Sequence, residues 1–363
     1  MQLSDSVDPA HVVAFVFSPL QALNLVEYIQ RFGRQVDLVV VGHASVIEPS
    51  SREQIEAVLS SISPGEILYD EWLLSPTRPA GALRKVAAAA TQLQEHLSTG
   101  PYEFVVGEYR SAFSWAVLQR LSGLVQRLVV VDDGTATLRI DRRNSVLKSP
   151  KVRRQKLKAL LFLGMGIRGV VPAAGLTFFT SYCLDDRVAE GDVIVRNDYR
   201  VLSAELRALP PDDECVYVIG GPHLEVGEVN HGDVELALEL TRFATEFTGK
   251  QVVYMAHRRE RGEKLDALRK EVTVVTPNVP FEIYPRVIGK RPRTIVGYYS
   301  SLFVTAAELL GDTVDIIALQ IPRDRINGSW LPFIDDIYQY YRSDLSAAVR
   351  IVEHPSSGPE RRA

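Results

Sequence analysis

The sequence predicts an α/β protein of two halves, each built around a parallel sheet, and three observations lead to this prediction. Short, almost entirely apolar runs end in small or acidic residues and are followed by helical patterns, as expected of strands buried on both faces. This alternation starts near residue 11 and starts again near residue 215. The length of 363 residues suits two domains, each large enough to bury a core.

The first half contains four predicted strands that end in small or polar residues. The strands are expected at His11–Phe17, Gln35–Val41, Phe104–Val106 and Leu128–Val131, with helices at Leu20–Arg31 and Ala112–Leu124. Ser18 follows the first of these strands, and Gly107 and Glu108 follow the third. Asp132 and Asp133 follow the fourth. Runs of this kind, joined by helices, indicate a doubly wound parallel sheet.

The second half repeats the alternation after a polar connection. Strands are expected at Cys215–Ile219, Gln251–Met255, Glu271–Thr276, Thr294–Tyr298 and Val314–Leu319, with helices at Val234–Thr248, Ser300–Leu310, Leu331–Tyr341 and around 264–270. The segment Leu206–Glu214, with its paired prolines and acids, is predicted to link the halves. We therefore expect domains at 1–207 and 208–345, and a disordered tail at 346–363.

Charge and cysteine content exclude several classes of protein. With 41 Lys and Arg against 45 Asp and Glu, the formal net charge is −4, so binding of nucleic acid by bulk charge is not expected. The two cysteines, Cys183 and Cys215, supply neither a disulfide framework nor a cysteine-rich zinc site. No Asp-x-Asp triplet, P-loop or HExxH motif occurs, and the histidines other than His257 show no ligand spacing. We expect no metal.

Targeting signals are also not predicted. The first ten residues contain Asp5 and Asp8 but no Lys or Arg, whereas a secretory signal begins with positive charge. The apolar stretches are too short or too interrupted to span a bilayer. The expected location is the cytoplasm.

One basic segment stands apart from the acidic average. Between Arg139 and Lys158 there are nine basic residues and one acid. A solvated basic loop or helix face explains this as well as a binding surface does. The functional alternatives are binding of an acidic acceptor glycan, or peripheral contact with the anionic inner face of the membrane through 139–163, with Leu157–Leu163 as an apolar face.

Candidate site residues follow from the position of ligands in open α/β sheets, which is at the carboxyl ends of the strands. This rule selects Ser18, Gly107, Glu108, Asp132, Asp133, Gly134, Gly220, Gly221, Pro222, His257, Glu282, Ser300 and Ser301. Asp132 and Asp133 are adjacent carboxylates that repel each other, which raises one pKa and leaves a proton acceptor. The alternative is a turn, because Asp-Gly is a common turn dipeptide and Asp caps helices.

The candidates of the second half suit a phosphate. His257 follows a strand and precedes two arginines, so it can donate to a phosphate or protonate a leaving group; the alternative is an exposed histidine in a basic loop. Ser300 and Ser301 open a helix, where serine is first of all an N-cap and can also bind phosphate with its hydroxyl and with free amides.

Taken in order, these motifs resemble those of the bacterial sialyltransferases and polysialyltransferases. Those enzymes carry an acidic-acidic-Gly motif, a His-Pro motif and a Ser-Ser pair. The corresponding residues here are Asp132-Asp133-Gly134, His257 within YMAHRRE, and Ser300-Ser301. Supporting similarities are Ser18-Pro-Leu-Gln21, Gly220-Gly221-Pro222 and Pro280-Phe-Glu282, so that the resemblance spans roughly 12–310. The departure is Arg258, which stands where the family has proline.

The resemblance implies a GT-B architecture, in which two Rossmann-like domains face a central cleft. It implies inverting transfer of sialic acid or a related nonulosonic acid from a CMP-sugar to a hydroxyl of a glycan or glycolipid, without metal or other cofactor. Asp132 or Asp133 would be the general base, with the first position preferred, and His257 the general acid or the donor to the departing phosphate. The donor-binding residues would be Gly220, Gly221, Pro222, Arg258, Glu282, Ser300 and Ser301.

Two other functions remain open at this point. The first is a GT-B transferase that uses another nucleotide sugar, such as a nucleoside-diphosphate sugar. The second is a protein that binds a nucleotide sugar without catalysis. Arg258, in place of the proline that would stiffen the turn after His257, leaves both alternatives standing.

Overall fold

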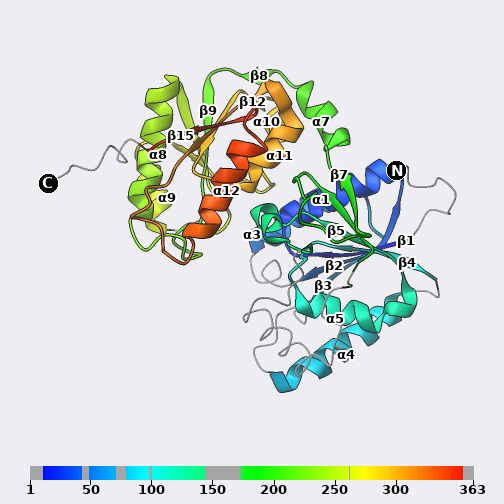
Figure 1. Cartoon of the computed structure of the whole chain (residues 1–363). Helices are drawn as coiled ribbons and strands as arrows, with labels where there is room; N and C mark the ends of the chain where they lie inside the picture. The colour runs from blue at the N-terminus through cyan, green and yellow to red at the C-terminus, as the bar shows by residue number, and fades with distance from the viewer. Residues whose placement is uncertain are drawn as a thin grey trace. The chain divides into compact units, whose positions relative to one another are not determined.

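The computed structural model describes residues 11–42, 49–70, 79–97, 100–143, 172, 174–260 and 262–354. The chain folds as two units, Met1–Asn197 and Asp198–Ala363. Each unit contains one large parallel sheet with helices on both faces (Figure 1). The predicted α/β class with two doubly wound parallel sheets is confirmed.

The first unit is built on a seven-stranded sheet. Its strands are β1 (His11–Val16), β2 (Gln35–Gly42), β3 (Glu66–Asp70), β4 (Tyr102–Val106), β5 (Val125–Val131), β6 (Leu176–Thr180) and β7 (Val193–Arg196). Their order is β3-β2-β1-β4-β5-β6-β7, and all neighbouring strands run parallel. The winding direction reverses between β1 and β4, where Ala14 lies opposite Val105. Such a switch point is where doubly wound sheets bind ligands.

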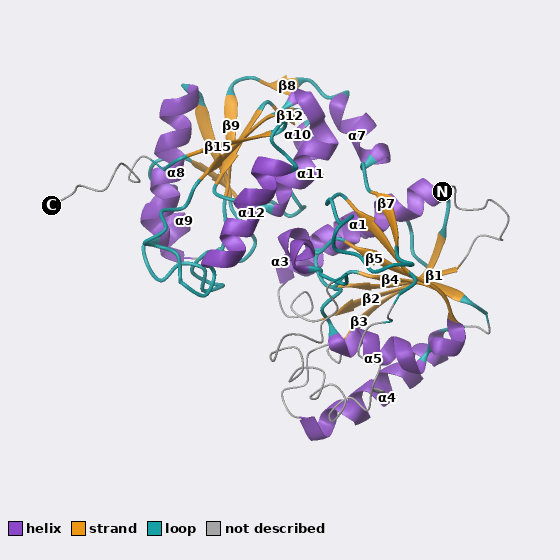
Figure 2. Ribbon diagram, in the orientation of Figure 1, coloured by secondary structure: helices purple, strands orange, loops and turns teal. Residues whose placement is uncertain are grey.

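The helices of this unit follow from caps and apolar faces. They are α1 (Pro19–Phe32), α3 (Pro49–Leu59), α4 (Pro79–His96) and α5 (Ala112–Arg120), with short 3₁₀ turns at Ser122–Leu124 and Gly134–Arg139. The hydroxyl of Ser18 caps α1 by accepting from the backbone N–H of Gln21, and Gly33, at φ 60°, ends it. In Figure 2, α1 and α3 cover one face of the sheet, and α4 and α5 cover the other.

The second unit is built on a six-stranded sheet and a two-stranded one. Its strands are β8 (Pro211–Asp212), β9 (Cys215–Ile219), β10 (Gln251–Met255), β11 (Thr273–Val275), β12 (Arg291–Pro292), β13 (Thr294–Gly297), β14 (Asp315–Leu319) and β15 (Val349–Val352). The large sheet has the order β11-β10-β9-β13-β14-β15, and its winding direction reverses between β9 and β13. β8 pairs with β12. The second switch point therefore lies beside Gly220.

Helices again lie on both faces of the large sheet of this unit (Figure 2). They are α7 (Arg200–Arg207), α8 (Asp233–Thr248), α9 (Gly262–Leu268), α10 (Tyr284–Ile288), α11 (Ser301–Leu310) and α12 (Leu331–Ser343), with a 3₁₀ turn at Gly311–Thr313. Ser300 caps α11, its hydroxyl accepting from the backbone N–H of Leu302. Two tyrosine hydroxyls of α12 donate to backbone carbonyls at or just after the carboxyl ends of strands. Tyr338 donates to the carbonyl of Leu319, and Tyr341 donates to that of Ser300.

The structure differs from the sequence-based boundaries at two places. The units divide between Asn197 and Asp198, ten residues before the expected boundary, because α7 packs on α11. The guanidinium of Arg207 donates to the carbonyl oxygens at the carboxyl end of α11, and 211–212 of the expected linker form β8. The expected disordered tail is wrong for 349–352, since these residues form β15, paired with β14; 355–363 lie outside the described residues.

Candidate functional site

The acidic pair of the first unit lies at the carboxyl end of β5, as predicted. Asp132 directly follows the strand, and Asp133 precedes the 3₁₀ turn that begins at Gly134. The two side chains differ in exposure, since Asp132 is 3% exposed and Asp133 is half-buried. Adjacent residues after a strand point in different directions, so the two carboxylates meet different partners.

Asp132 is a structural carboxylate. The hydroxyl of Thr180 donates to its Oδ1 at 2.5 Å, and the backbone N–H of Ser181 donates to its Oδ2 at 2.8 Å. The amide of Asn24 on α1 donates to its backbone carbonyl at 3.1 Å. Burial raises the pKa of Asp132 to about 6, although the hydrogen bonds from Thr180 and Ser181 favour the charged form. Both carboxylate oxygens of Asp132 therefore hold β6 to β5.

Asp133 is the less buried of the two carboxylates. The amide of Gln21 on α1 donates to its Oδ1 at 2.6 Å, and the side-chain oxygen of Gln21 accepts from the backbone N–H of Phe17 at 2.7 Å. Burial raises the pKa of Asp133 to about 7, with Glu108 and Asp132 adding to the rise. A half-buried carboxylate with a pKa near neutrality is suited to proton transfer.

Gly107 leaves room for the side chain of Gln21 beside Asp133, and replacing this glycine tests that packing. A Cβ at residue 107 would collide with the side-chain oxygen of Gln21 and lie 2.9 Å from the carbonyl oxygen of Phe15. We expect Gly107→Ala to lower the free energy of unfolding by about 1–3 kcal/mol. Because Gln21 then leaves Asp133, the pKa of that carboxyl should rise further. Urea unfolding measures the first effect.

Gly123→Ala is the matched control, because a Cβ at residue 123 meets nothing within 4 Å. Its free energy of unfolding should stay within about 0.5 kcal/mol of the wild type. Equal losses in the two variants would contradict the packing role of Gly107.

The glycine turn of the second unit lies at the carboxyl end of β9. A Cβ at Gly220 would collide with the carboxylate of Glu260 and lie 2.8 Å from the hydroxyl of Tyr254. The amine of Lys264, 4% exposed, donates to the carbonyl of Gly221 at 2.8 Å and pairs with the carboxylates of Glu260 and Asp233. This buried cluster fixes the turn against the loop that carries His257.

Two hydrogen bonds, to Glu260 and from Arg259, hold His257 in its loop. Its backbone N–H donates to Glu260 at 2.6 Å, and its Nδ1 accepts from the backbone N–H of Arg259 at 3.2 Å. Burial, with the charges of Arg258 and Arg259 and of His223, lowers the pKa of His257 well below its usual value. The imidazole is therefore neutral at pH 7. Both ring nitrogens face donors, since Nε2 lies 3.4 Å from the guanidinium of Arg258; the shorter contact, from the backbone N–H of Arg259 to Nδ1, assigns the proton to Nε2.

The serine pair and Glu282 are also at the carboxyl edge of the second sheet. The hydroxyl of Ser300 is used as the cap of α11, and its backbone N–H donates to Tyr341 at 3.1 Å. Ser301 is half-exposed at the first position of the helix. Glu282 is 8% exposed and accepts from Thr305 at 3.1 Å; burial raises its pKa. Of the two serines, the second is the better placed for a ligand.

The structure thus places every candidate of the second half at the carboxyl edge of one sheet, on loops after β9, β10, β11 and β13. Arg258 acts electrostatically on Glu282, and His223 on His257, so these groups are neighbours. The basic segment is described only up to residue 143. Within it, Arg142 is buried in an ion pair with Asp192 and is not part of a surface. Residues 144–163 lie outside the described residues.

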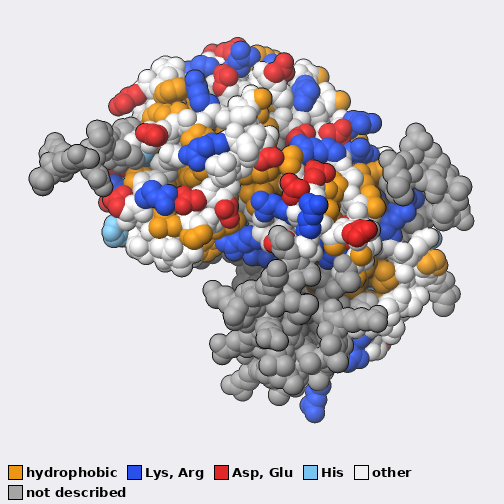
Figure 3. Space-filling model, in the orientation of Figure 1, with side chains coloured by type: hydrophobic (Ala, Val, Ile, Leu, Met, Phe, Trp, Pro, Cys, Tyr) orange, Lys and Arg blue, Asp and Glu red, His pale blue; other side chains and the backbone are white. Residues whose placement is uncertain are grey.

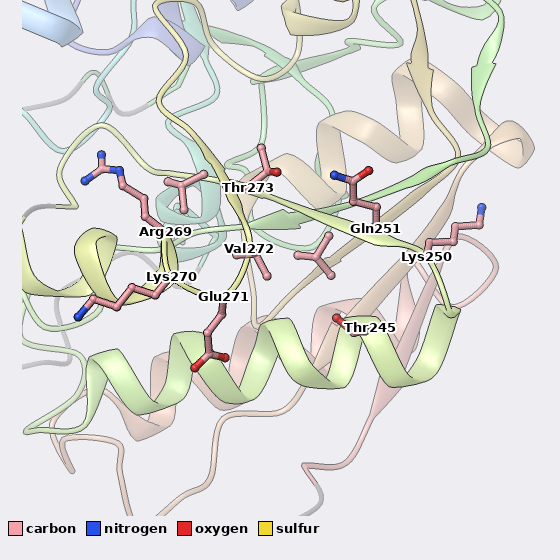
Figure 4. Close-up of a pocket in the computed structure, with 10 residues that line it drawn as sticks. Thr245, Lys250, Gln251, Arg269, Lys270, Glu271, Val272 and Thr273 are labelled. Carbon is pink, nitrogen blue, oxygen red and sulfur yellow. The ribbon is translucent and has the colours of Figure 1, made fainter.

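A groove of about 660 Å³ lies elsewhere, at the amino ends of β10 and β11 (Figure 4). Lys250, Arg269 and Lys270 border it, and Glu271 there pairs with Arg242 on α8 at 3.1 Å. Ligands of doubly wound sheets bind at the opposite ends of the strands. The groove is therefore not the candidate site.

On the face of the second unit seen in Figure 3, acidic and basic side chains are interspersed, as on an ordinary solvated surface.

Several residues of these two sites were not predicted as site residues. Asn24, Thr180 and Ser181 support Asp132, and Lys264 supports the glycine turn. Their roles come from contacts between distant parts of the chain, which no local pattern reveals. His223 was set aside because it lacks ligand spacing, yet it directly follows the glycine turn; its place at a strand end was the available signal.

In the described residues, no group of three or more His, Cys, Asp or Glu side chains is arranged to hold a metal ion. None of the helices in the described part of the chain is both long and apolar enough to cross a membrane.

Comparison with known proteins gives structural matches only. No protein-family model and no curated protein matches the sequence. S. aureus MnaA, solved with UDP, matches with a TM-score of 0.53 and 12% identity over 95% of this chain and 84% of that one. The UDP-GlcNAc 2-epimerase of Methanocaldococcus jannaschii matches with a TM-score of 0.50 and 11% identity over 95% and 88%. At these identities the likeness shows the fold, which is GT-B-like with two Rossmann-like halves.

These matches correct the family suggested by the motifs. The similar solved structures include UDP-GlcNAc 2-epimerases and a UDP co-structure, and these are not sialyltransferases that use CMP-sialic acid. The resemblance to the bacterial sialyltransferases is therefore wrong as an assignment. Its motifs are short and sit at strand ends, where any nucleotide-binding sheet of this type favours glycine, serine and charged residues.

Proposed function

We propose that this chain is an enzyme acting on a nucleotide sugar whose leaving group is UDP, with the diphosphate bound by the loops after β9, β10 and β13. The observation that carries the proposal is the position of His257 beside Arg258 at the carboxyl end of β10, with Nε2 of the imidazole 3.4 Å from the guanidinium. A phosphate oxygen there accepts from the guanidinium and from the Nε2–H of His257. Uridine is chosen because the similar structures include a UDP co-structure and UDP-GlcNAc 2-epimerases.

The chemistry proposed for the first unit is proton transfer by Asp133. Its pKa of about 7 lets it exist as a base at neutral pH while remaining strong enough to accept a proton from a hydroxyl. Asp132, the position preferred from the sequence, has both oxygens engaged and is proposed instead to position the loop. The expectation of a metal-free reaction came in part from the resemblance to enzymes that use a CMP-sugar, and that part does not carry over to a diphosphate leaving group.

A thermal-shift panel of nucleotides tests the choice of ligand. We expect UDP and UDP-GlcNAc to raise the melting temperature most, ahead of CMP, GDP and ADP. At a ligand concentration of 100 times the Kd the stabilisation is about 2.7 kcal/mol, or roughly 5–10 °C for a domain of this size. His257→Asn should remove most of this shift. The control is His96→Asn, at a surface position in the first unit, which should leave the shift unchanged.

The result that contradicts the proposal is also specific. A largest shift with CMP, or no shift with any uridine nucleotide, would overturn it. Turnover is followed separately, as consumption of UDP-GlcNAc on anion-exchange chromatography with and without glycan acceptors. Strong binding of UDP-GlcNAc without consumption under any condition would favour the non-catalytic alternative.

A further inference from the structure

The second unit contains a histidine–carboxylate pair that the proposed function has not used. His223 follows the glycine turn after β9, and its Nδ1 lies 2.7 Å from Oε2 of Glu228. The backbone carbonyl of His223 accepts from the N–H of Glu228 at 2.8 Å and from that of Val229 at 3.2 Å. The loop is therefore closed on itself, and it delivers the carboxylate to one nitrogen of the ring.

The other ring nitrogen is available. The side chain of His223 is 8% exposed, and its Nε2 has no hydrogen-bond partner among the residues that the structure describes. A Cβ at Gly221 would lie 2.5 Å from Nε2, so the ring edge faces the glycine turn. The ring centre is 5.4 Å from that of Tyr299 and 6.0 Å from that of Tyr298, which holds the ring in place from the β13 side. A ring nitrogen without a partner, on a largely buried side chain that faces the glycine turn at the switch point of the sheet, is placed to meet a ligand.

The charges around His223 come from three directions. Glu228 lies on its own loop. His257, on which His223 acts electrostatically, lies on the loop after β10, and Lys264 on α9 bonds to the carbonyl of the nearby Gly221. On the β13 side the facing groups are the two tyrosines. His223 thus has one carboxylate on its own loop and a cation and a second histidine on the elements beside it, where a bound anion would be a further negative partner.

We propose that His223 and Glu228 form a proton-linked phosphate-binding pair, which rests on the proposed function and names a second phosphate contact of that same site. In neutral His223 the single proton lies on Nδ1, where Glu228 accepts it, and Nε2 presents a lone pair. A phosphate oxygen is repelled by that lone pair and attracted by an N–H. Binding a phosphate at Nε2 therefore takes up one proton from solution.

The two histidines of the site then behave differently toward pH. His257 carries its proton on Nε2 because its Nδ1 accepts from a backbone N–H, so it donates to phosphate without taking up a proton. His223 donates only when protonated. Because the bound form carries one more proton on His223 than the neutral ring does, we expect the Kd of the nucleotide sugar to rise with pH by up to tenfold per unit, with uptake approaching one proton per ligand.

Isothermal titration with UDP-GlcNAc tests this inference. This probe is chosen because both of its phosphates are diesters, whereas a terminal phosphate titrates near pH 6 and would itself take up protons. Titrations at pH 6.5, 7.5 and 8.5, in buffers of different ionisation enthalpy, give the Kd and the number of protons bound. In the wild type the Kd should rise by tenfold or more across this range. In His223→Asn, which keeps an amide beside Glu228 but has nothing at Nε2, it should stay within threefold.

Three further variants sharpen the result. Glu228→Gln removes the carboxylate, so proton uptake at pH 7.5 should fall and the Kd should rise. His257→Asn should weaken binding at every pH while the pH dependence remains. The control is His231→Asn, at an exposed position eight residues after His223, which should match the wild type.

The outcomes separate the inference from the proposed function. If the wild type binds UDP-GlcNAc with a Kd that does not change with pH, or if His223→Asn keeps the wild-type proton uptake, the inference is overturned and the proposed function stands. If neither the wild type nor His231→Asn binds UDP-GlcNAc, the proposed function fails and the inference fails with it.

Discussion

Replacing Asp133 by asparagine should reduce turnover by about 10²- to 10⁴-fold, the usual contribution of a positioned general base. The amide cannot accept a proton, but its oxygen can still accept from Gln21, so the loop is retained. Because UDP is proposed to bind in the other unit, the thermal shift given by UDP should be unchanged. Loss of turnover with binding intact separates a chemical role from a structural one.

The pH dependence of turnover and of stability tests the role of Asp133 a second time. The base must be deprotonated, so wild-type turnover should rise with pH and level off above a midpoint near the raised pKa of Asp133, about 7. The raised pKa also means that the charged form is disfavoured by folding, so stability is lost as pH rises from the unfolded value of 3.8 toward 7. Asp133→Asn should therefore be more stable than the wild type at pH 8 and similar to it near pH 4. A turnover loss below threefold would remove Asp133 as the base.

Replacing Arg142 by alanine should lower the free energy of unfolding by about 3–5 kcal/mol, because it leaves a buried charge without its partner. The Arg142 and Asp192 side chains are 5% and 0% exposed and are joined by two hydrogen bonds, of 2.5 and 3.0 Å. Arg142 also donates to the carbonyl of Pro172, and Asp192 accepts from the backbone N–H of Leu176. One ion pair thus ties the segment after Asp133 to the start of β6.

The neighbouring arginine is the matched control. Arg143 pairs with Asp186, but the two side chains are 62% and 96% exposed. An exposed pair contributes about 0–1 kcal/mol, so Arg143→Ala should unfold in urea almost like the wild type. Equal urea midpoints for Arg142→Ala and Arg143→Ala would show that burial of the Arg142 pair does not add to stability.

The local patterns predicted most of the fold because it consists of short buried strands and capped helices. The strand at 251–255 and the helix starting after Ser300 agree with β10 and α11 within a residue. The misses have physical reasons. β15 is a four-residue strand at the edge of the second large sheet, and β3 and β7 are short strands at the two edges of the first. Short edge elements owe their conformation to the sheet they join, not to their own sequence.

The candidate site was predictable in position but not in the roles of its residues. The rule that ligands bind at the carboxyl ends of strands located Asp132, Asp133 and His257 correctly at sheet edges. It did not distinguish the structural carboxylate from the more available one, since this depends on Thr180 and Ser181, almost fifty residues away. Nor did it give the charge state of His257, which burial and the adjacent arginines determine.

The parallel pairing of both large sheets bears on how the chain reaches its structure. Within the sheets of the described residues every strand pair is parallel, so no two sequential strands are joined by a tight hairpin. The central pairings join distant segments: Ala14 lies opposite Val105, and Val218 opposite Val296. Bringing such distant segments together costs loop-closure entropy before the contacts between them stabilise the chain, and this slows folding. Until β4 and β13 arrive, β1 and β9 expose apolar edges, and this is the interval in which the chain is most prone to aggregate.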